Sequence, residues 1–215
     1  LAVVYVNNCR AKNCVTTPGL SDQSFVRGKV PMTKEEVRAV TLSKLRLTED
    51  STVYDIGSGT GSVSVECALH CYLGHVFAIE KSQEGYLLTT ANKKAFGADN
   101  ITVIQAAAPE GMESLPAPTH AFIGGSSGNM REIILSLYEK NPKVRIVINT
   151  IAVESLAETV ALLKELKIKD VDITQINVSK NKRAGRYNLM MAQNPVCVIA
   201  FGGETGETMK EDENE

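Results

Sequence analysis

The sequence lacks the residue patterns that build most metal centres and membrane segments. Its five cysteines include no CxxC pair, and its three histidines, His70, His75 and His120, do not lie at metal-ligand spacing. No apolar run approaches the ~20 residues that span a bilayer, and no signal-peptide pattern opens the chain. We therefore expect no bound metal, no membrane partner and a cytoplasmic protein with reduced thiols.

A strong charge of either sign is also missing. The 215 residues carry a formal net charge of −2, and residues 203–215 alone contribute −5, which leaves +3 for the rest. So small a surplus does not indicate a nucleic-acid partner. The acidic end is predicted to be a disordered tail.

The length fits one substantial domain, which we place over residues 19–202. A composition with 43% hydrophobic and 22% charged residues is typical of globular proteins. Because the first residue is Leu rather than Met, we expect something to precede it. Residues 1–18 are then a linker or the stub of a fused upstream domain.

Predicted strands alternate with predicted helices along this domain. The alternation favours an α/β fold with a doubly wound, mostly parallel sheet of seven strands. A polar loop, residues 179–194, leads to the last strand, which can therefore run antiparallel. Thr33 and Glu36 are predicted to form a capping box for the first helix. Strands are expected at 52–57, 75–80, 101–105, 119–124, 144–150, 170–178 and 195–201, and helices at 33–46, 62–72, 83–96, 110–114, 129–140 and 154–166.

A glycine-rich loop follows the first of these strands. Glycine allows positive φ and lets a ligand lie against the backbone, near the free N–H groups of the helix that follows. The dinucleotide fingerprint is G-x-G-x-x-G, whereas here the third glycine falls at the fifth position. Asp55, two residues before the loop, would repel a pyrophosphate but suits a ligand with a cationic amino group. The loop comprises Gly57, Ser58, Gly59, Thr60 and Gly61 and resembles the first motif of class I S-adenosylmethionine (SAM) methyltransferases.

A second anchor lies at the end of the next predicted strand. Glu80 follows Gly61 by 19 residues, and an acidic residue about 20 residues past such a loop can accept hydrogen bonds from ribose hydroxyls. Hydrogen bonds to a charged acceptor contribute roughly 1.5–3 kcal/mol each. Loop and carboxylate together predict SAM as cofactor.

The fourth strand ends in a further glycine-rich stretch, Gly124 to Gly128. Ligands of doubly wound sheets bind outside the carboxyl ends of the strands. A reacting group could therefore approach the methyl donor here. The stretch could equally be a flexible turn in which Ser127 caps the next helix, and both interpretations stay open.

Several stretches together resemble the decarboxylating precorrin methyltransferases of cobalamin biosynthesis. The resemblance implies methylation of carbon 15 of a precorrin or cobalt-precorrin, with loss of carbon dioxide from the ring C acetate. It covers about residues 19–201. The matching segments are residues 19–25, Met32 to Arg38, Asp55 to Gly61, Ala108-Pro109-Glu110, Phe122 to Ser126, Asn149 with Glu154-Ser155, and Asn194-Pro195.

The resemblance also assigns residues to the cofactor. It implies that Thr33, the loop from Gly57 to Gly61, Glu80 and Ala108 bind SAM. The family commonly has Gly-Asp-Ala where this chain has Ala106-Ala107-Ala108. A carboxylate near the adenine amino group is therefore missing.

The implied chemistry needs no catalytic triad, because the sulfonium is already activated and an electron-rich macrocycle carbon can attack it. Aligning the reactants can supply roughly 7–11 kcal/mol, and the conjugated ring can take up electrons as carbon dioxide leaves. We therefore expect no essential histidine. Ser126 and Asn149 are the candidate polar groups at the reaction centre.

The basic cluster before the last strand is a candidate substrate site. Lys180, Lys182, Arg183 and Arg186 could hold carboxylates of a tetrapyrrole, with Arg183 and Arg186 foremost. A merely solvated loop fits the pattern equally well. The family resemblance further implies a homo-oligomer, a tetramer.

Three other functions fit parts of the sequence. A nicotinamide-dependent oxidoreductase is disfavoured by the glycine spacing and by Asp55. An RNA or protein methyltransferase would share the cofactor site, but the charge is weak and no Asn/Asp-Pro-Pro-Tyr-like segment follows the fourth strand. A SAM-binding module without catalysis stays open, because Ala107 breaks the family pattern.

Overall fold

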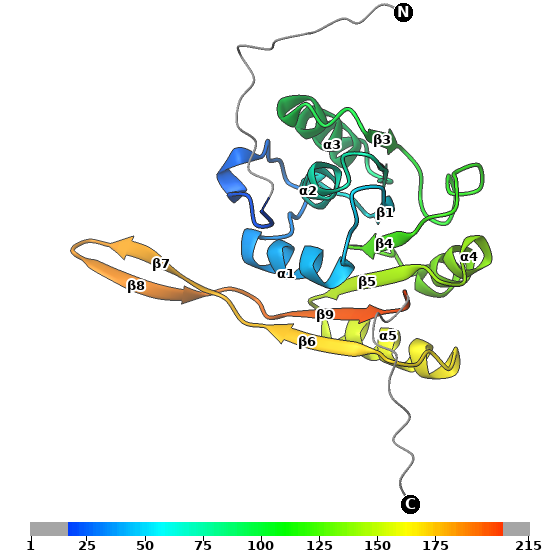
Figure 1. Ribbon diagram of the computed structural model, residues 1–215. Coiled ribbons are helices and arrows are strands. Elements are labelled where there is room, and N and C mark those ends of the chain that lie inside the picture. The colour runs from blue at the N-terminus through cyan, green and yellow to red at the C-terminus, as the bar shows by residue number, and fades with distance from the viewer. Residues whose placement is uncertain (1–16, 204–215) are drawn as a thin grey trace, which may run out of the picture.

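A computed structural model describes residues 17–203 as an α/β domain built on one seven-stranded sheet (Figure 1). The strand order is β3-β2-β1-β4-β5-β9-β6, with β9 antiparallel to both of its neighbours and the other pairs parallel. The predicted doubly wound sheet with an antiparallel last strand is therefore confirmed. The strands are β1 Thr52–Ile56, β2 His75–Ile79, β3 Ile101–Ile104, β4 His120–Ile123, β5 Arg145–Thr150, β6 Asp172–Ile176 and β9 Val196–Phe201.

Helices cover both faces of this sheet. Side chains alternate along a strand, so in β5 Ile146 and Ile148 enter one core while Val147 enters the other. The first core also contains residues of α4 and α5, and the second contains residues of α1 and α2. The helices are α1 Glu35–Leu45, α2 Ser62–His70, α3 Gln83–Phe96, α4 Met130–Lys140 and α5 Val153–Glu165, after a single 3-10 turn, η1 Asp22–Ser24.

Three local predictions were wrong. The first helix has Lys34 rather than Thr33 at its N-cap, without a side-chain cap, and the Glu36 carboxylate pairs with Lys180 instead of closing a capping box. Residues 110–114 form turns rather than a helix. The supposed loop 179–194 contains a β-hairpin, whose two faces are both largely exposed and so leave no apolar alternation in the sequence.

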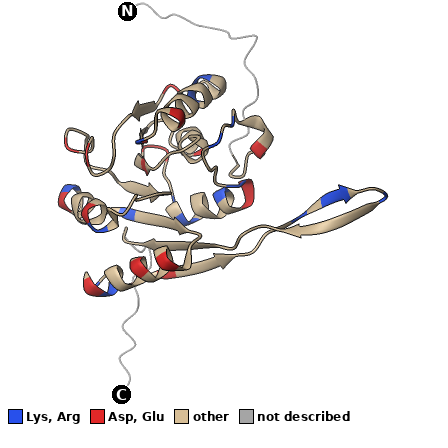
Figure 2. Cartoon of the chain, turned by 180° about the vertical axis from the view of Figure 1, so that it is seen from behind, with Lys and Arg blue, Asp and Glu red and all other residues tan. Residues whose placement is uncertain are grey.

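This hairpin, here called the arm, projects from the body of the domain (Figure 1). It consists of β7 Ser179–Ala184 and β8 Tyr187–Ala192, which pair with each other and not with the main sheet. Every residue of β8 is exposed. The arm carries basic residues and no acidic ones (Figure 2).

The predicted upstream stub and acidic tail fall almost wholly on residues 1–16 and 204–215, outside the described residues. The described residues include all of the predicted domain, 19–202. Among them, no helix is long and apolar enough to cross a membrane.

Candidate active site

A cleft of about 890 Å³ opens at the carboxyl ends of the central strands. Its volume lies in the upper part of the range of about 300–1,000 Å³ typical of small-molecule sites. The glycine loop and Glu80 line one side, and the turn from Gly124 to Ser127 lines another. The segment Arg27–Lys34 and the end of β5 complete the wall, so the cleft lies where ligands bind in doubly wound folds.

The three glycines of the loop have different surroundings. All three have positive φ, between 56° and 74°. A Cβ on Gly57 would lie 2.8 Å from the Gly125 carbonyl oxygen, and one on Gly61 would lie 2.7 Å from the Thr89 methyl group. A Cβ on Gly59 would lie 3.0 Å from the Pro31 carbonyl oxygen and 4.0 Å from the Gly57 carbonyl oxygen, with no side chain within 4 Å. Gly59 therefore leaves backbone open to a ligand, whereas Gly57 and Gly61 are required by close packing.

Glu80 lies at the carboxyl end of β2, as predicted, and is 7% exposed. One carboxylate oxygen accepts a hydrogen bond from the Gly59 N–H at 2.9 Å, and the other accepts one from the Ser82 N–H at 2.8 Å. Each carboxylate oxygen can accept a second hydrogen bond. The Glu80 side chain is thus held in place with free capacity for ribose hydroxyls, and the residues present fit SAM.

The structure separates the predicted cofactor residues into two groups. Those that line the cleft are Thr33, Gly57, Ser58, Gly59, Glu80 and Ala108. Thr60 and Gly61 lie behind this wall: Thr60 is 1% exposed, and its carbonyl accepts a hydrogen bond from Asn92. They support the loop rather than face the cleft.

Asp55 also lies behind the wall. It is fully buried, and its carboxylate accepts a hydrogen bond from the Ser64 hydroxyl. Burial raises the pKa of this carboxyl to about 7, and the Ser64 hydrogen bond offsets part of the rise. Asp55 does not line the described cleft, so any attraction between this carboxyl and a cationic ligand group acts without direct contact.

Ser126 and Asn149 line the cleft together with the cofactor residues. The Asn149 amide donates to the Thr41 hydroxyl at 2.9 Å, which fixes its orientation from α1. Ser127 does not cap α4, because that helix begins after Asn129 and Ser127 adopts φ 55°. Of the two interpretations of residues 124–128, the one with Ser127 as a helix cap is therefore wrong.

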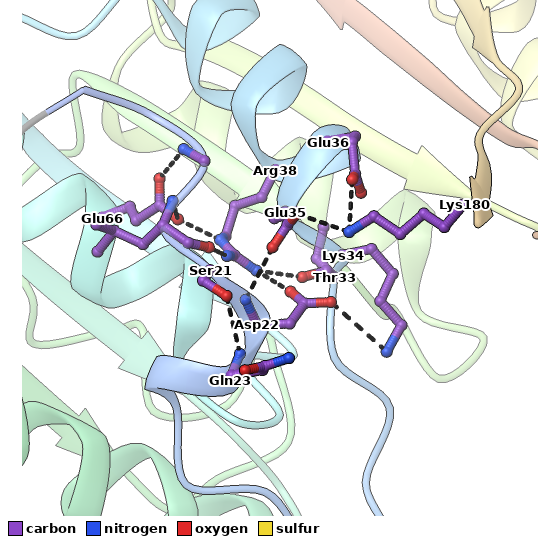
Figure 3. Close-up of polar contacts among 12 residues, drawn as sticks. Ser21, Asp22, Gln23, Thr33, Lys34, Glu35, Glu36, Arg38, Glu66 and Lys180 are labelled. Carbon is purple, nitrogen blue, oxygen red and sulfur yellow. Dashed lines mark hydrogen bonds and ion pairs between the residues drawn. The ribbon is translucent and has the colours of Figure 1, made fainter. Parts of the chain in front are cut away.

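The two arginines predicted to hold substrate are not in the cleft of their own chain. Arg183 and Arg186 lie near the tip of the arm, where the Arg186 guanidinium sits 5.0 Å from the Tyr187 ring centroid. Lys180, at the base of the arm, pairs with Glu35 and Glu36 at 2.6 Å each (Figure 3). The clamp was predicted because these residues shortly precede β9 in the sequence. In the structure they lie on the arm, which projects from the body of the domain (Figure 1).

One residue that holds the cleft wall was not predicted. The buried Arg38 guanidinium pairs with Glu66 and with Asp22, and it also donates to the carbonyls of Leu20 and Thr33 (Figure 3). Glu66 in turn accepts hydrogen bonds from the backbone N–H groups of Gly19 and Leu20. The sequence signal for such a buried ion pair was a charged residue next to the apolar residues of α1, Val37, Leu42 and Leu45.

None of the three histidines lines the cleft. His75 and His120 begin β2 and β4, at the opposite end of the sheet, and His70 ends α2. Burial lowers the pKa of His120 to about 4. Within the described part of the chain, no group of three metal-ligating side chains gathers.

The sheet order, the glycine loop and Glu80 together define a class I SAM-dependent methyltransferase, and SAM is its cofactor. Residues 24–201 match the family model described as the precorrin methyltransferase domain. The chain therefore belongs to the precorrin methyltransferase family.

Named relatives agree with this assignment. A Pyrobaculum calidifontis protein called a probable cobalt-precorrin-6B C(15)-methyltransferase (decarboxylating) is 43% identical over 186 residues, 85% of this chain and 95% of that protein. A Salmonella typhimurium cobalt-precorrin-6B C(15)-methyltransferase (decarboxylating) is 36% identical over 84% of this chain and 94% of that protein. A crystal structure described as precorrin-6y C5,15-methyltransferase, from Geobacter metallireducens, superposes with a TM-score of 0.80 at 38% identity, over 86% of this chain and 97% of that one.

Proposed function

We propose that this enzyme methylates carbon 15 of cobalt-precorrin-6B and removes carbon dioxide from the ring C acetate, with SAM as methyl donor. The observation that carries the proposal is 43% identity to a relative of that name along nearly its whole length. The cleft supports it, because cofactor residues and the candidate polar groups Ser126 and Asn149 line the same space.

The chain's own contribution is positioning of the cofactor and the substrate. SAM supplies an activated methyl group when bound. Gly59, Glu80, Thr33 and Ala108 line the same cleft. We expect Glu80 to bind the ribose hydroxyls beside Gly59, and Thr33 and Ala108 to contact the remainder of the cofactor. Asn149, oriented by Thr41, is placed to hold the macrocycle so that its nucleophilic carbon faces the methyl group.

The glycine loop offers a matched pair of variants for the cofactor site. Gly59→Val fills open space in the cleft and should abolish SAM binding, with a stability loss of only about 1–2 kcal/mol for a side chain at positive φ. Gly97→Val is the control, because Gly97 also has positive φ and nothing lies within 4 Å of its Cβ position. Calorimetry that finds equal SAM affinity in Gly59→Val and Gly97→Val would refute the assignment.

The reaction itself is tested by mass spectrometry of the product. Purified enzyme is incubated with SAM and either cobalt-precorrin-6B or the metal-free precorrin. We expect the cobalt form to gain one methyl group and lose one carbon dioxide. Turnover of the metal-free form alone would reassign the substrate within the family.

We also propose that the protein is a homo-oligomer, a tetramer, and that the arm mediates its assembly. The arm exposes large apolar side chains, which single chains rarely present to water in such density. In that arrangement Arg183 and Arg186 would reach substrate carboxylates at the cleft of a neighbouring copy. The exposed apolar residues of the arm are Tyr187, Leu189, Met190 and Met191.

Replacing residues 180–191 by a short turn tests this assembly. The domain should keep its fold, since β7 and β8 pair only with each other among the described strands. Losing the partly exposed ion pairs of Lys180 with Glu35 and Glu36 should cost about 0–1 kcal/mol each. Light scattering should then report the mass of a single chain, against a multiple for the parent. An unchanged mass after arm removal would exclude the arm as the interface.

A further inference from the structure

The mouth of the cleft carries an unbalanced positive charge. Four cationic residues line it: Arg27, Lys29, Lys34 and Lys81, here called the cation rim. Glu80 is the one carboxylate among the described residues of the same wall. Its oxygens accept hydrogen bonds from the backbone N–H groups of Gly59 and Ser82 rather than from a rim side chain.

The rim charges are largely unpaired. Arg27, Lys29 and Lys81 are exposed, and within the described residues no hydrogen bond or ion pair engages the side chain of any of the three. Lys34 lies 3.9 Å from Asp22, at the limit of an ion pair, with 38% of its side chain exposed. Asp22 is already bonded to Arg38. The rim is therefore available to an anionic ligand.

Side chains of α3 hold the backbone around two of the rim residues, Arg27 and Lys29. The Val26 N–H donates to the Asn92 side chain at 2.7 Å, and the Asn92 amide donates back to the Val26 carbonyl at 2.9 Å. The Lys29 N–H donates to Glu84 at 2.6 Å. A Cβ on Gly28 would lie 2.4 Å from that Glu84 oxygen, so a side chain there would displace the Glu84 carboxylate. Because these hydrogen bonds hold the backbone before a ligand binds, only the side chains of Arg27 and Lys29 have to be ordered there on binding.

We propose that the cation rim binds carboxylates of the tetrapyrrole substrate, an inference that rests on the function proposed above. SAM carries a sulfonium, an ammonium and one carboxylate, so it can match one rim cation and adds positive charge of its own. Three cations remain, and a macrocycle with several acidic side chains lying across the cofactor supplies their partners. Arg27 is suited to bidentate binding of a carboxylate.

The methionine carboxylate of SAM has the same chemistry and must be separated from the substrate. Steady-state kinetics separate the two ligands, because KM is measured for each at saturating concentrations of the other. The double variant Arg27→Gln/Lys29→Gln removes two rim charges and keeps polar side chains. Lys94→Gln/Lys164→Gln is the matched control, since both lysines are exposed and lie outside the cleft wall.

For the rim variant we expect KM for cobalt-precorrin-6B to rise about tenfold with kcat unchanged, since exposed charge pairs are individually weak. KM for SAM should stay within about twofold. The parent's KM for the tetrapyrrole should increase with salt, and this dependence should be shallower in the rim variant. The control variant should match the parent in all these measurements.

Two results would overturn the inference while leaving the proposed function intact. One is an active parent whose KM for the tetrapyrrole equals that of the rim variant at low salt. The other is a rise in KM for SAM alone, which would assign the rim to the cofactor. A parent that fails to turn over the tetrapyrrole would refute the proposed function, and the rim inference with it.

Discussion

Among individual residues, Asp55 links the fold to pH. Its pKa is raised from 3.8 to about 7 by burial, whereas the unfolded chain keeps the ordinary value. Between these two values the folded state holds the proton more tightly than the unfolded state. The contribution of Asp55 to stability therefore falls as pH rises through this window and is constant above it. The loss amounts to roughly 4 kcal/mol at its upper end.

Urea unfolding of the parent and of Asp55→Asn checks this prediction. Asn keeps an oxygen that accepts the Ser64 hydrogen bond but never ionises. The variant should gain stability over the parent between about pH 4 and pH 7. His120, whose pKa is lowered by burial, has the opposite trend but cancels in the difference. A stability difference between variant and parent that does not vary with pH would contradict the raised pKa of Asp55.

Ala107 offers a gain of function at the cofactor site. It lines the cleft, at the position where the family resemblance described above implies an aspartate, and a methyl group makes no hydrogen bond. Ala107→Asp should restore a carboxylate for the adenine amino group and tighten SAM binding about tenfold, the lower end of a charged hydrogen bond.

An analogue of SAM with hypoxanthine in place of adenine provides the control for Ala107→Asp. It presents a carbonyl where adenine has its amino group, so its affinity should not improve. Calorimetry of the parent and the variant with both ligands separates a specific hydrogen bond from a general effect of charge. Equal gains for the two ligands would count against the adenine contact.

At the scale of elements, α1 and α2 hold the segment that walls the cleft through Arg38 and Glu66, which are 0% and 2% exposed. Removing one partner of such a pair leaves a buried charge and should cost about 3–5 kcal/mol. Arg38→Met should therefore lower the free energy of unfolding by that amount. The double variant Arg38→Met/Glu66→Gln should recover part of it, because the unpaired charge is gone.

Lys44→Met is the matched control for this experiment. Lys44 also pairs with a carboxylate, Asp172, but the two side chains are 28% and 47% exposed. An exposed pair contributes about 0–1 kcal/mol. Denaturant titrations in which Arg38→Met and Lys44→Met lose the same stability would show that the buried pair does not anchor the wall.

The elements also show what the sequence could and could not reveal. The main sheet was predictable because its central strands are buried and its strands alternate with helices, so local patterns and long-range packing agree. The arm was missed because neither of its faces meets a core, so its composition resembles a loop. Arg38 was missed because its partners Asp22 and Glu66 lie far along the chain in opposite directions.

The candidate site was predictable to the same degree. Gly59, Glu80, Ser126 and Asn149 converge on one cleft because each follows a strand, and parallel strands bring their carboxyl ends together. Arg183 and Arg186 lie outside the cleft of their own chain, because proximity in sequence to β9 does not fix the direction of a hairpin. The cation rim could not be inferred from spacing, since Arg27 and Lys81 are far apart in the sequence and line the same cleft only in the folded chain.

In the whole molecule, one cleft combines a rigid cofactor side, oriented polar groups and a mouth rich in cations. The Gly59 N–H donates to the Glu80 carboxylate and so fixes the glycine loop against Glu80 on the cofactor side of the cleft. Arg38 fixes the neighbouring wall segment by donating to the Thr33 carbonyl. The reaction requires this assembly, because alignment of donor and acceptor replaces acid–base catalysis. We therefore attribute catalysis to the alignment of methyl donor and acceptor rather than to a histidine.

The most direct test uses SAM labelled with ¹³C in its methyl group and cobalt-precorrin-6B as substrate. NMR and mass spectrometry of the product should show the label bonded to carbon 15 and the loss of one carbon dioxide, and Gly59→Val should give neither change. A product labelled elsewhere, or one that retains the ring C acetate, would contradict the account.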